Sequence, residues 1–251
     1  MRLGPLLNMS KPRFLQAPSP VQRLAIVLMV CVAVFVLYQL SFVIRIVWFN
    51  YYNPSSSAVM RTTLAELRLH NPDAQLQFEW VAYEQISDQL KRAVISSEDA
   101  NFLNHSGVEW EAIRQAWEYN KQQAAQGSDR RRGGSTLTQQ LAKNLFLSTD
   151  RSYARKAQEL FLSVLIEAIM SKERILELYL NLAQWGQNQF GAQAAAKRYF
   201  TTTAHALTAA QAARLAAMLP SPVFYDQKGN TAYLQRRTQT ILQRMRLVSA
   251  P

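Results

Sequence analysis

Two adjacent carboxylates, Glu98 and Asp99, open the stretch 98–107, which reads EDANFLNHSG. His105 follows six residues after Asp99. A carboxylate pair near an imidazole is typical of general acid–base catalysis, of a metal site, or of a turn held by local hydrogen bonds. Metal binding is the weakest of these interpretations, because the chain has 3 histidines and its single cysteine lies before residue 50. The residues alone leave the other two open.

Basic residues are concentrated in a second stretch, 130–156, in which Asp150 is the only acid. A run of charge such as Arg130–Arg132 is usually a solvated surface. Lys143 differs, because it follows a Gly-Gly turn and a predicted helix start at Ser135 or Thr136, whose free N–H groups attract anions. Lysine and arginine side chains near such a start commonly bind oxygens on phosphorus. The other cations of the stretch are Arg151, Arg155 and Lys156.

A third pattern lies in the predicted helix 155–170, whose apolar residues cover most of the circumference. A helix that is apolar nearly all round is predicted to be buried. Polar side chains nevertheless recur every four residues, at Arg155, Glu159, Ser163 and Glu167. A buried carboxylate is costly unless it is paired or faces water. The ribbon therefore predicts either an internal ion-pair network, such as Arg155–Glu159, or a wet cleft.

The composition limits what can position these residues. The chain has 251 residues, with 28 Lys and Arg against 17 Asp and Glu, a formal charge of +11 and a pI near 10.0. This length suits one compact domain with an appendage, and an apolar share of 49% excludes a disordered polyelectrolyte. The single cysteine, Cys31, excludes an internal disulfide. No glycine-rich nucleotide-binding motif occurs, and the excess of positive charge predicts an anionic partner: nucleic acid, phospholipid or a phosphorylated substrate.

The run 24–44 contains no charged residue. As a helix it spans about 32 Å, enough to cross a bilayer, whereas a cleaved signal peptide would have a shorter apolar core. We therefore predict a transmembrane anchor at 24–49, a linker at 50–74 and a domain at 75–251. The residues before the anchor, 1–23, carry cations and no acid, so the positive-inside rule places them in the cytoplasm and the domain outside the inner membrane.

Within the domain the sequence predicts mainly helices. Alternation over 75–81 predicts the one strand, and the polar stretch 121–132 predicts an exposed loop. Helical periodicity continues through 175–183 and into a last basic helix at 231–247. Another helix starts at a capping box formed by Thr208 and Gln211.

The order of the motifs resembles the peptidoglycan glycosyltransferases of family 51. The resemblance covers about 86–222, and its most specific part is the stretch GGSTLTQQ at 133–140. It rests on Glu98-Asp99-x-x-Phe102-x-x-His105-x-Gly107, Gly133 to Gln140 followed by Lys143-Asn144, Arg155-Lys156-x-x-Glu159, and Ile175-Leu176-Glu177-x-Tyr179-Leu180-Asn181. Three positions depart from the family pattern, namely Ser163, Gln211 and the pair Thr201-Thr202, and these departures concern local packing. No transpeptidase motif such as SxxK or KTG occurs, so the match is to the monofunctional members.

The resemblance implies a mainly α, lysozyme-like domain behind a single N-terminal transmembrane helix. It implies polymerisation of lipid II into β-1,4-linked glycan with inversion and release of undecaprenyl diphosphate. Glu98 would be the general base, and Glu159 a second catalytic carboxylate that orients the cations. The implied substrate and diphosphate contacts are Asp99, Phe102, His105, Ser135, Thr136, Gln139, Gln140, Lys143, Asn144, Arg151, Arg155 and Lys156.

This chemistry requires no cofactor, although the resemblance allows Mg²⁺ or Mn²⁺ at the diphosphate near Glu159. The expected partners are lipid II, the growing glycan chain, the inner membrane, and proteins of cell division or elongation. Nucleic acid is not expected, because the domain is exported. Two alternatives stand beside this hypothesis: a membrane-bound lytic enzyme that cleaves glycan, and a basic membrane-tethered binding module.

Overall fold

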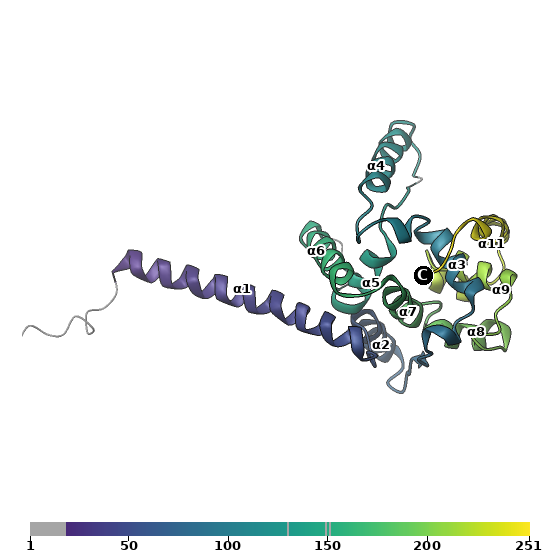
Figure 1. The fold of residues 1–251 in the computed structure, drawn as a ribbon, viewed down its shortest axis with the longest axis horizontal. Helices are drawn as coiled ribbons and strands as arrows, with labels where there is room; N and C mark the ends of the chain where they lie inside the picture. Colours follow the sequence, from purple (N-terminus) through teal and green to yellow (C-terminus); the bar gives the residue numbers. More distant parts are fainter. Residues whose placement is uncertain (1–18, 130, 149, 151) are drawn as a thin grey trace, which may run out of the picture. The chain divides into compact units, whose positions relative to one another are not determined.

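The computed structural model describes residues 19–129, 131–148, 150 and 152–251. Most of the predicted cytoplasmic segment, together with Arg130 and Arg151, therefore lies outside the described residues. The chain divides into two compact units, one ending at Val43 and one running from Ile44 to Pro251. Figure 1 shows the ribbon with its element labels.

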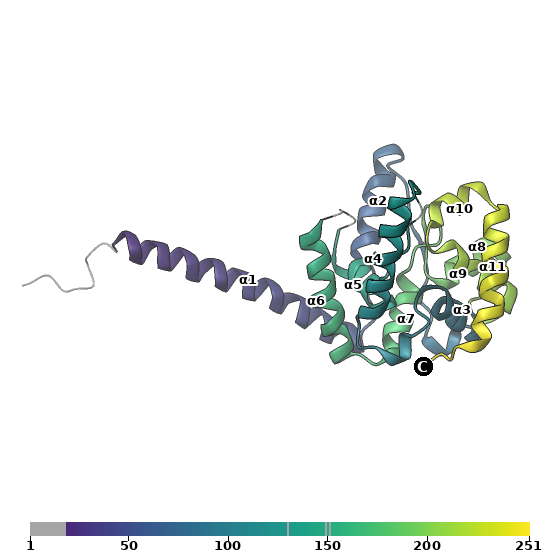
Figure 2. The ribbon, with the colours of Figure 1, turned by 90° about the horizontal axis from the view of Figure 1, so that it is seen from above.

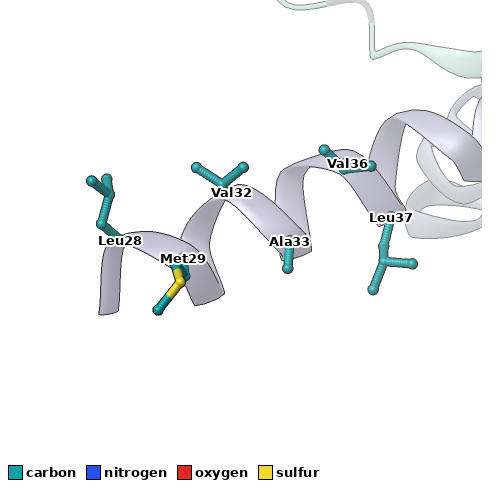
Figure 3. A pocket seen from close by; sticks show the side chains of 6 residues that line it. All are labelled: Leu28, Met29, Val32, Ala33, Val36 and Leu37. Carbon is teal, nitrogen blue, oxygen red and sulfur yellow. The ribbon is translucent and has the colours of Figure 1, made fainter. Parts of the chain in front are cut away.

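The first unit contains most of helix α1 (Pro20–Tyr51), which includes the whole predicted anchor. Ser19 and Gln22 cap its start reciprocally, with the Ser19 N–H donating to Gln22 Oε1 at 2.8 Å. Among the described residues it is the one helix long and apolar enough to cross a membrane, with a mean hydropathy of 2.6. Figure 3 shows apolar side chains along its surface, from Leu28 to Leu37. These side chains face outward, as lipid-facing residues would.

The last turns of α1 belong to the second unit. Ile46 is fully buried there. Arg174 donates from Nε to the carbonyl oxygen of Phe49 at 2.9 Å and from Nη2 to that of Tyr52 at 3.1 Å, which satisfies acceptors at the helix end. The predicted anchor, 24–49, thus overlaps the compact unit over its final residues.

The helices of the second unit form two groups in both views (Figures 1 and 2). In the first group α3 packs against α9 and α11, and α8 lies beside them in both views. In the second group α5 packs against α2, α6 and α7, and α4 extends outward. The bounds are α2 Ala58–His70, α3 Asp88–Glu98, α4 Trp110–Ala125, α5 Leu137–Phe146, α6 Tyr153–Ile169, α7 Lys172–Leu182, α8 Ala192–Phe200, α9 Ala209–Met218, α10 Pro222–Lys228 and α11 Ala232–Arg244. Short 3-10 turns are η2 Tyr83–Gln85, η3 Phe102–Asn104 and η4 Met245–Leu247.

Most predicted elements are confirmed, with two corrections. The predicted strand shortens to β1 (Gln77–Phe78), which pairs in parallel with β2 (Gln189–Phe190), a strand too short to show alternation. The predicted loop 121–132 is helical over its first residues, because α4 continues to Ala125. The predicted capping box of α9 is present, and Thr136 with Gln139 forms a second one on α5.

Helix α6 corrects a third prediction, that its apolar circumference buries it. Its outward face is apolar and exposed: Tyr153 is 97% exposed, and Phe161 and Val164 are about half exposed. The polar ribbon instead points inward, with Glu159 and Ser163 buried. Leu162 and Ile166 are also fully buried, so the inward face combines apolar residues with the polar ribbon, while a second apolar face stays exposed.

Candidate active site

Glu98 is the last residue of α3, and its carboxylate contacts α5 of the other group of helices. Gln140 of α5 donates from Nε2 to Glu98 Oε2 at 3.2 Å, and Ser97 donates from Oγ to Oε1 at 3.1 Å. Arg237 of α11 places Nη2 at 3.6 Å from Oε1. The Glu98 side chain stays 13% exposed, so a carboxylate held by three neighbours still reaches the surface.

Tyr179 of α7 fixes the amide of Gln140. Its hydroxyl donates to Gln140 Oε1 at 3.0 Å, which turns the amide N–H toward Glu98. Burial, and then the charges of Glu98 and Asp99, raise the pKa of Tyr179 well above its usual value. The phenol therefore remains a donor at every physiological pH, and the Tyr179–Gln140–Glu98 chain keeps one direction.

Asp99, the neighbour of Glu98, serves a different purpose because its side chain is only 1% exposed. Its carboxylate accepts from His105 Nε2 at 2.9 Å and from the N–H of Leu137, the first residue of α5, at 2.9 Å. His105 Nδ1 accepts from the Gly107 N–H at 3.1 Å, which leaves the ring hydrogen on Nε2. Asp99 and His105 thus tie the loop after Glu98 to the start of α5.

The start of α5 also contacts the loop that follows Glu98. Thr136 Oγ1 donates to the carbonyl oxygen of Gly107 at 2.6 Å. Gly107 has a φ of +89°, and a Cβ there would lie 2.7 Å from the carbonyl oxygen of Ser163, so this position requires glycine. Gln139 is fully buried, and its Nε2 has no hydrogen-bond partner among the described residues. Thr136 and Gln139, which the resemblance assigns to substrate binding, are both buried here.

Phe102 is also fully buried, in η3. Lys172 lies 4.5 Å above its ring centroid, donates to the His105 carbonyl oxygen at 2.6 Å, and pairs with Glu167 at 2.8 Å. Glu167 in turn accepts from Thr138 Oγ1 at 2.6 Å. These contacts fix the segment 98–107 against α5 and α7, and Phe102 contributes to the site through packing.

Cations gather on α5 and α6. Glu159 is buried between Arg155, whose Nη1 lies 2.6 Å from Oε2, and Lys156, whose ammonium contacts Oε1. Lys156 also donates to Ser135 Oγ at 2.9 Å. The predicted Arg155–Glu159 ion pair is thus present, and it extends to a third partner.

Lys143 is the unsatisfied member of this cluster. Burial lowers the pKa of its ammonium from 10.5; Glu159 and Glu98 oppose this effect, whereas Arg155 and Lys156 add to it. No described residue forms a hydrogen bond or ion pair with the ammonium. Arg155 and Lys156 against Glu159 leave an excess of positive charge around Lys143, which itself interacts electrostatically with Glu98. Asn144, the next residue, is partly exposed, and Arg151 lies outside the described residues.

A transglycosylase domain is matched over residues 63–246, which contain every residue of this site. The chain is 58% identical over 225 residues to a biosynthetic peptidoglycan transglycosylase of Bordetella pertussis, with 90% of this chain and 93% of the relative covered. It is 50% identical over 224 residues to the protein of that name from Herminiimonas arsenicoxydans, with 89% and 95% covered. The chain belongs to the transglycosylase family. The predicted family, glycosyltransferase activity and mainly α fold are confirmed.

The transglycosylase site does not fit a divalent ion at Glu159. Both carboxylate oxygens of Glu159 already face a cation. No group of three or more His, Cys, Asp or Glu residues that could hold a metal occurs in the part of the chain that is described. We therefore derive no step through Mg²⁺ or Mn²⁺.

The sequence analysis did not predict two residues of the candidate site, Lys172 and Arg237. Lys172 is the first residue of α7, and a single lysine in a basic chain forms no recognisable motif. Arg237 lies in the last helix, 139 positions after Glu98, among other basic residues. Only the packing of α11 against α3 brings it to the carboxylate.

Proposed function

We propose that this transglycosylase polymerises lipid II into β-1,4-linked glycan, with inversion and with release of undecaprenyl diphosphate. The observation that carries the proposal is the pairing of two unlike groups. One is an accessible carboxylate, Glu98, and the other is a desolvated ammonium, Lys143, without a described partner. A base and an anion site within electrostatic reach of each other match the two ends of a glycosyl transfer to a hydroxyl.

In the proposed step the acceptor's 4-hydroxyl loses its proton to Glu98 as its oxygen bonds to the anomeric carbon of the growing chain. The bond from that carbon to the diphosphate oxygen breaks on the opposite face, and its electron pair leaves with undecaprenyl diphosphate. A placed carboxylate is typically worth ~10²–10⁴-fold in such a transfer. Lys143, Arg155 and Lys156 stabilise the departing anion, and no acid is needed to protonate it.

The cations favour synthesis over glycan cleavage. A lytic enzyme must protonate a sugar oxygen as it leaves, whereas a diphosphate leaves as an anion and needs positive charge. The outward apolar face of α1 is consistent with a single-pass anchor. We propose that the basic N-terminus stays in the cytoplasm and that the domain works at the outer face of the inner membrane, where a lipid-borne substrate would lie.

Purified full-length protein in detergent tests the proposal with lipid II as sole substrate. We expect a ladder of glycan products from the wild type. Glu98→Gln should lower turnover by ~10²-fold or more, because it keeps the shape and removes the base. Its retained binding of lipid II and unchanged melting temperature are the controls. Release of fragments from finished sacculi, without polymer from lipid II, would support the lytic alternative instead.

A further inference from the structure

Arg237 approaches the proposed base from a helix that carries none of the sequence motifs. Its Nη2 donates to Ser97 Oγ at 3.1 Å and lies 3.6 Å from Glu98 Oε1. Glu98 is the one acid within ion-pair distance of this guanidinium among the described residues. The side chain of Arg237 is 30% exposed, so most of its length is packed between α11 and α3.

The Ser97 hydroxyl connects the two charges. It has a single hydrogen and two acceptors in reach, Glu98 Oε1 at 3.1 Å and the Ala216 carbonyl oxygen at 3.5 Å. The shorter contact goes to Glu98, while Arg237 donates into a lone pair of the same hydroxyl. The direction of donation therefore runs from Arg237 through Ser97 to Glu98 Oε1.

The carboxylate is consequently held from both groups of helices. Gln140, directed by Tyr179, contacts Oε2, and Ser97 with Arg237 contacts Oε1. One donor on each oxygen fixes the rotation of the carboxylate about its last bond. Because Gln140 is the one donor to Oε2 among the described residues, a lone pair on that oxygen remains available for the acceptor's proton.

The placement of the Arg237 guanidinium is unfavourable for folding stability in one respect. Arg237 Nε is buried and has no hydrogen-bond partner among the described residues. A buried donor left unpaired is unfavourable for folding, so stability alone does not account for the placement. The neighbouring Arg236 shows the contrast: its side chain is exposed, and its guanidinium forms no hydrogen bond or ion pair with a described residue.

We infer that Arg237 is a positioning residue for Glu98, acting on Oε1 directly by charge and through the Ser97 hydroxyl. This inference rests on the proposed function, because it assigns a role relative to the proposed base. The other groups near Glu98 are Lys143 from α5, Tyr179 from α7 and Asp99 beside it. Arg237 is the cation among them that shares a hydrogen-bonded neighbour with the carboxylate.

The test compares steady-state polymerisation of lipid II by full-length variants in detergent. Arg237→Ala should lower kcat about tenfold, the low end of what a hydrogen bond to a charged group is worth, because the pair is partly solvated. KM for lipid II should stay within about twofold, since the residue acts on the base and not on substrate binding. Arg237→Lys should recover part of kcat, and the matched control Arg236→Ala should leave both constants unchanged.

Three results would overturn the inference: a rise in KM with unchanged kcat, equal losses from Arg236→Ala and Arg237→Ala, or no recovery by lysine. If Arg237→Ala lowers the melting temperature strongly, the kcat values of Arg237→Lys and Arg237→Gln are compared instead. Both variants keep a long polar side chain, but only the lysine keeps the charge, so a higher kcat for the lysine supports the inference. The base itself is tested separately. If Glu98→Gln is active, the proposed function is wrong. If Glu98→Gln is inactive and Arg237→Ala is fully active, only the positioning role is wrong.

Discussion

Replacing Lys143 by methionine should reduce activity and stabilise the fold at the same time. Methionine keeps an unbranched side chain of similar length and removes the charge. A hydrogen bond to a charged group is typically worth about 1.5–3 kcal/mol, so turnover of lipid II should fall by roughly 10–150-fold. The ammonium has no hydrogen-bond partner among the described residues, so its removal leaves no group unpaired in the free protein. The loss of activity should therefore arise only when the anionic substrate binds.

The stability gain follows from the sign of the pKa shift. Burial lowers the pKa of Lys143, so its charged form is less favourable in the folded chain than in the unfolded chain. This penalty is present in full below the folded pKa and disappears as the pH rises through the unfolded value of 10.5. Removing the charge at neutral pH relieves a desolvation cost on the order of 1 kcal/mol, or roughly 2–4 °C in melting temperature.

The same shift predicts a pH dependence. Lys143 must be protonated to bind the diphosphate, so kcat/KM should fall as the pH rises through its lowered pKa, below 10.5. Lys143→Arg stays charged in this range and should retain kcat/KM to higher pH. Arg131→Ala is the matched control, because Arg131 is exposed and its Nη1 donates to the Ser128 carbonyl oxygen. Near-normal activity of Lys143→Met, or a loss equal to that of Arg131→Ala, would refute a defined anion site.

Three further predictions concern the fold and the membrane. Gly107→Ala should lower the free energy of unfolding by about 2 kcal/mol or more. Gly133→Ala should not, because an added Cβ there meets nothing within 4 Å; thermal melting of both variants checks this. Removing residues 1–43 should leave a domain that polymerises lipid II in detergent. Removing 1–50 should lower the melting temperature of that domain, because Ile46 and the Phe49 carbonyl bound by Arg174 belong to the compact unit. In liposome flotation of the shorter deletion, Phe161→Ser should weaken binding, and a variant that floats like the parent would contradict a membrane-facing α6.

Local signals in the sequence predicted the starts of α5 and α9. Thr136 with Gln139, and Thr208 with Gln211, lie three residues apart, and each pair satisfies N–H groups within one turn. Such contacts depend only on neighbours along the chain. The proposed catalytic role of Glu98 came from the motif resemblance, whereas the side chains that hold it, Gln140 and Arg237, come from other helices.

Long-range packing limited the prediction of the site. Asp99 and Phe102 belong to the same motif as Glu98, yet they face the interior, and no spacing rule separates an exposed carboxylate from a buried one beside it. Arg237 reaches Glu98 only because α11 crosses α3. A basic residue in a basic helix gives no sequence signal for such a contact.

Helix α6 shows why hydrophobicity alone could not predict its orientation. An apolar circumference is equally compatible with a protein core and with lipid, and the sequence favoured the core. The structure leaves Phe161 and Val164 without cover and turns Glu159 inward toward Lys156. One helix therefore carries an exposed apolar face suited to lipid and, at other positions, cations suited to a diphosphate. Because a lipid-borne diphosphate lies at the membrane surface, contact of this face with lipid would bring the cation cluster to the depth at which its proposed substrate is found.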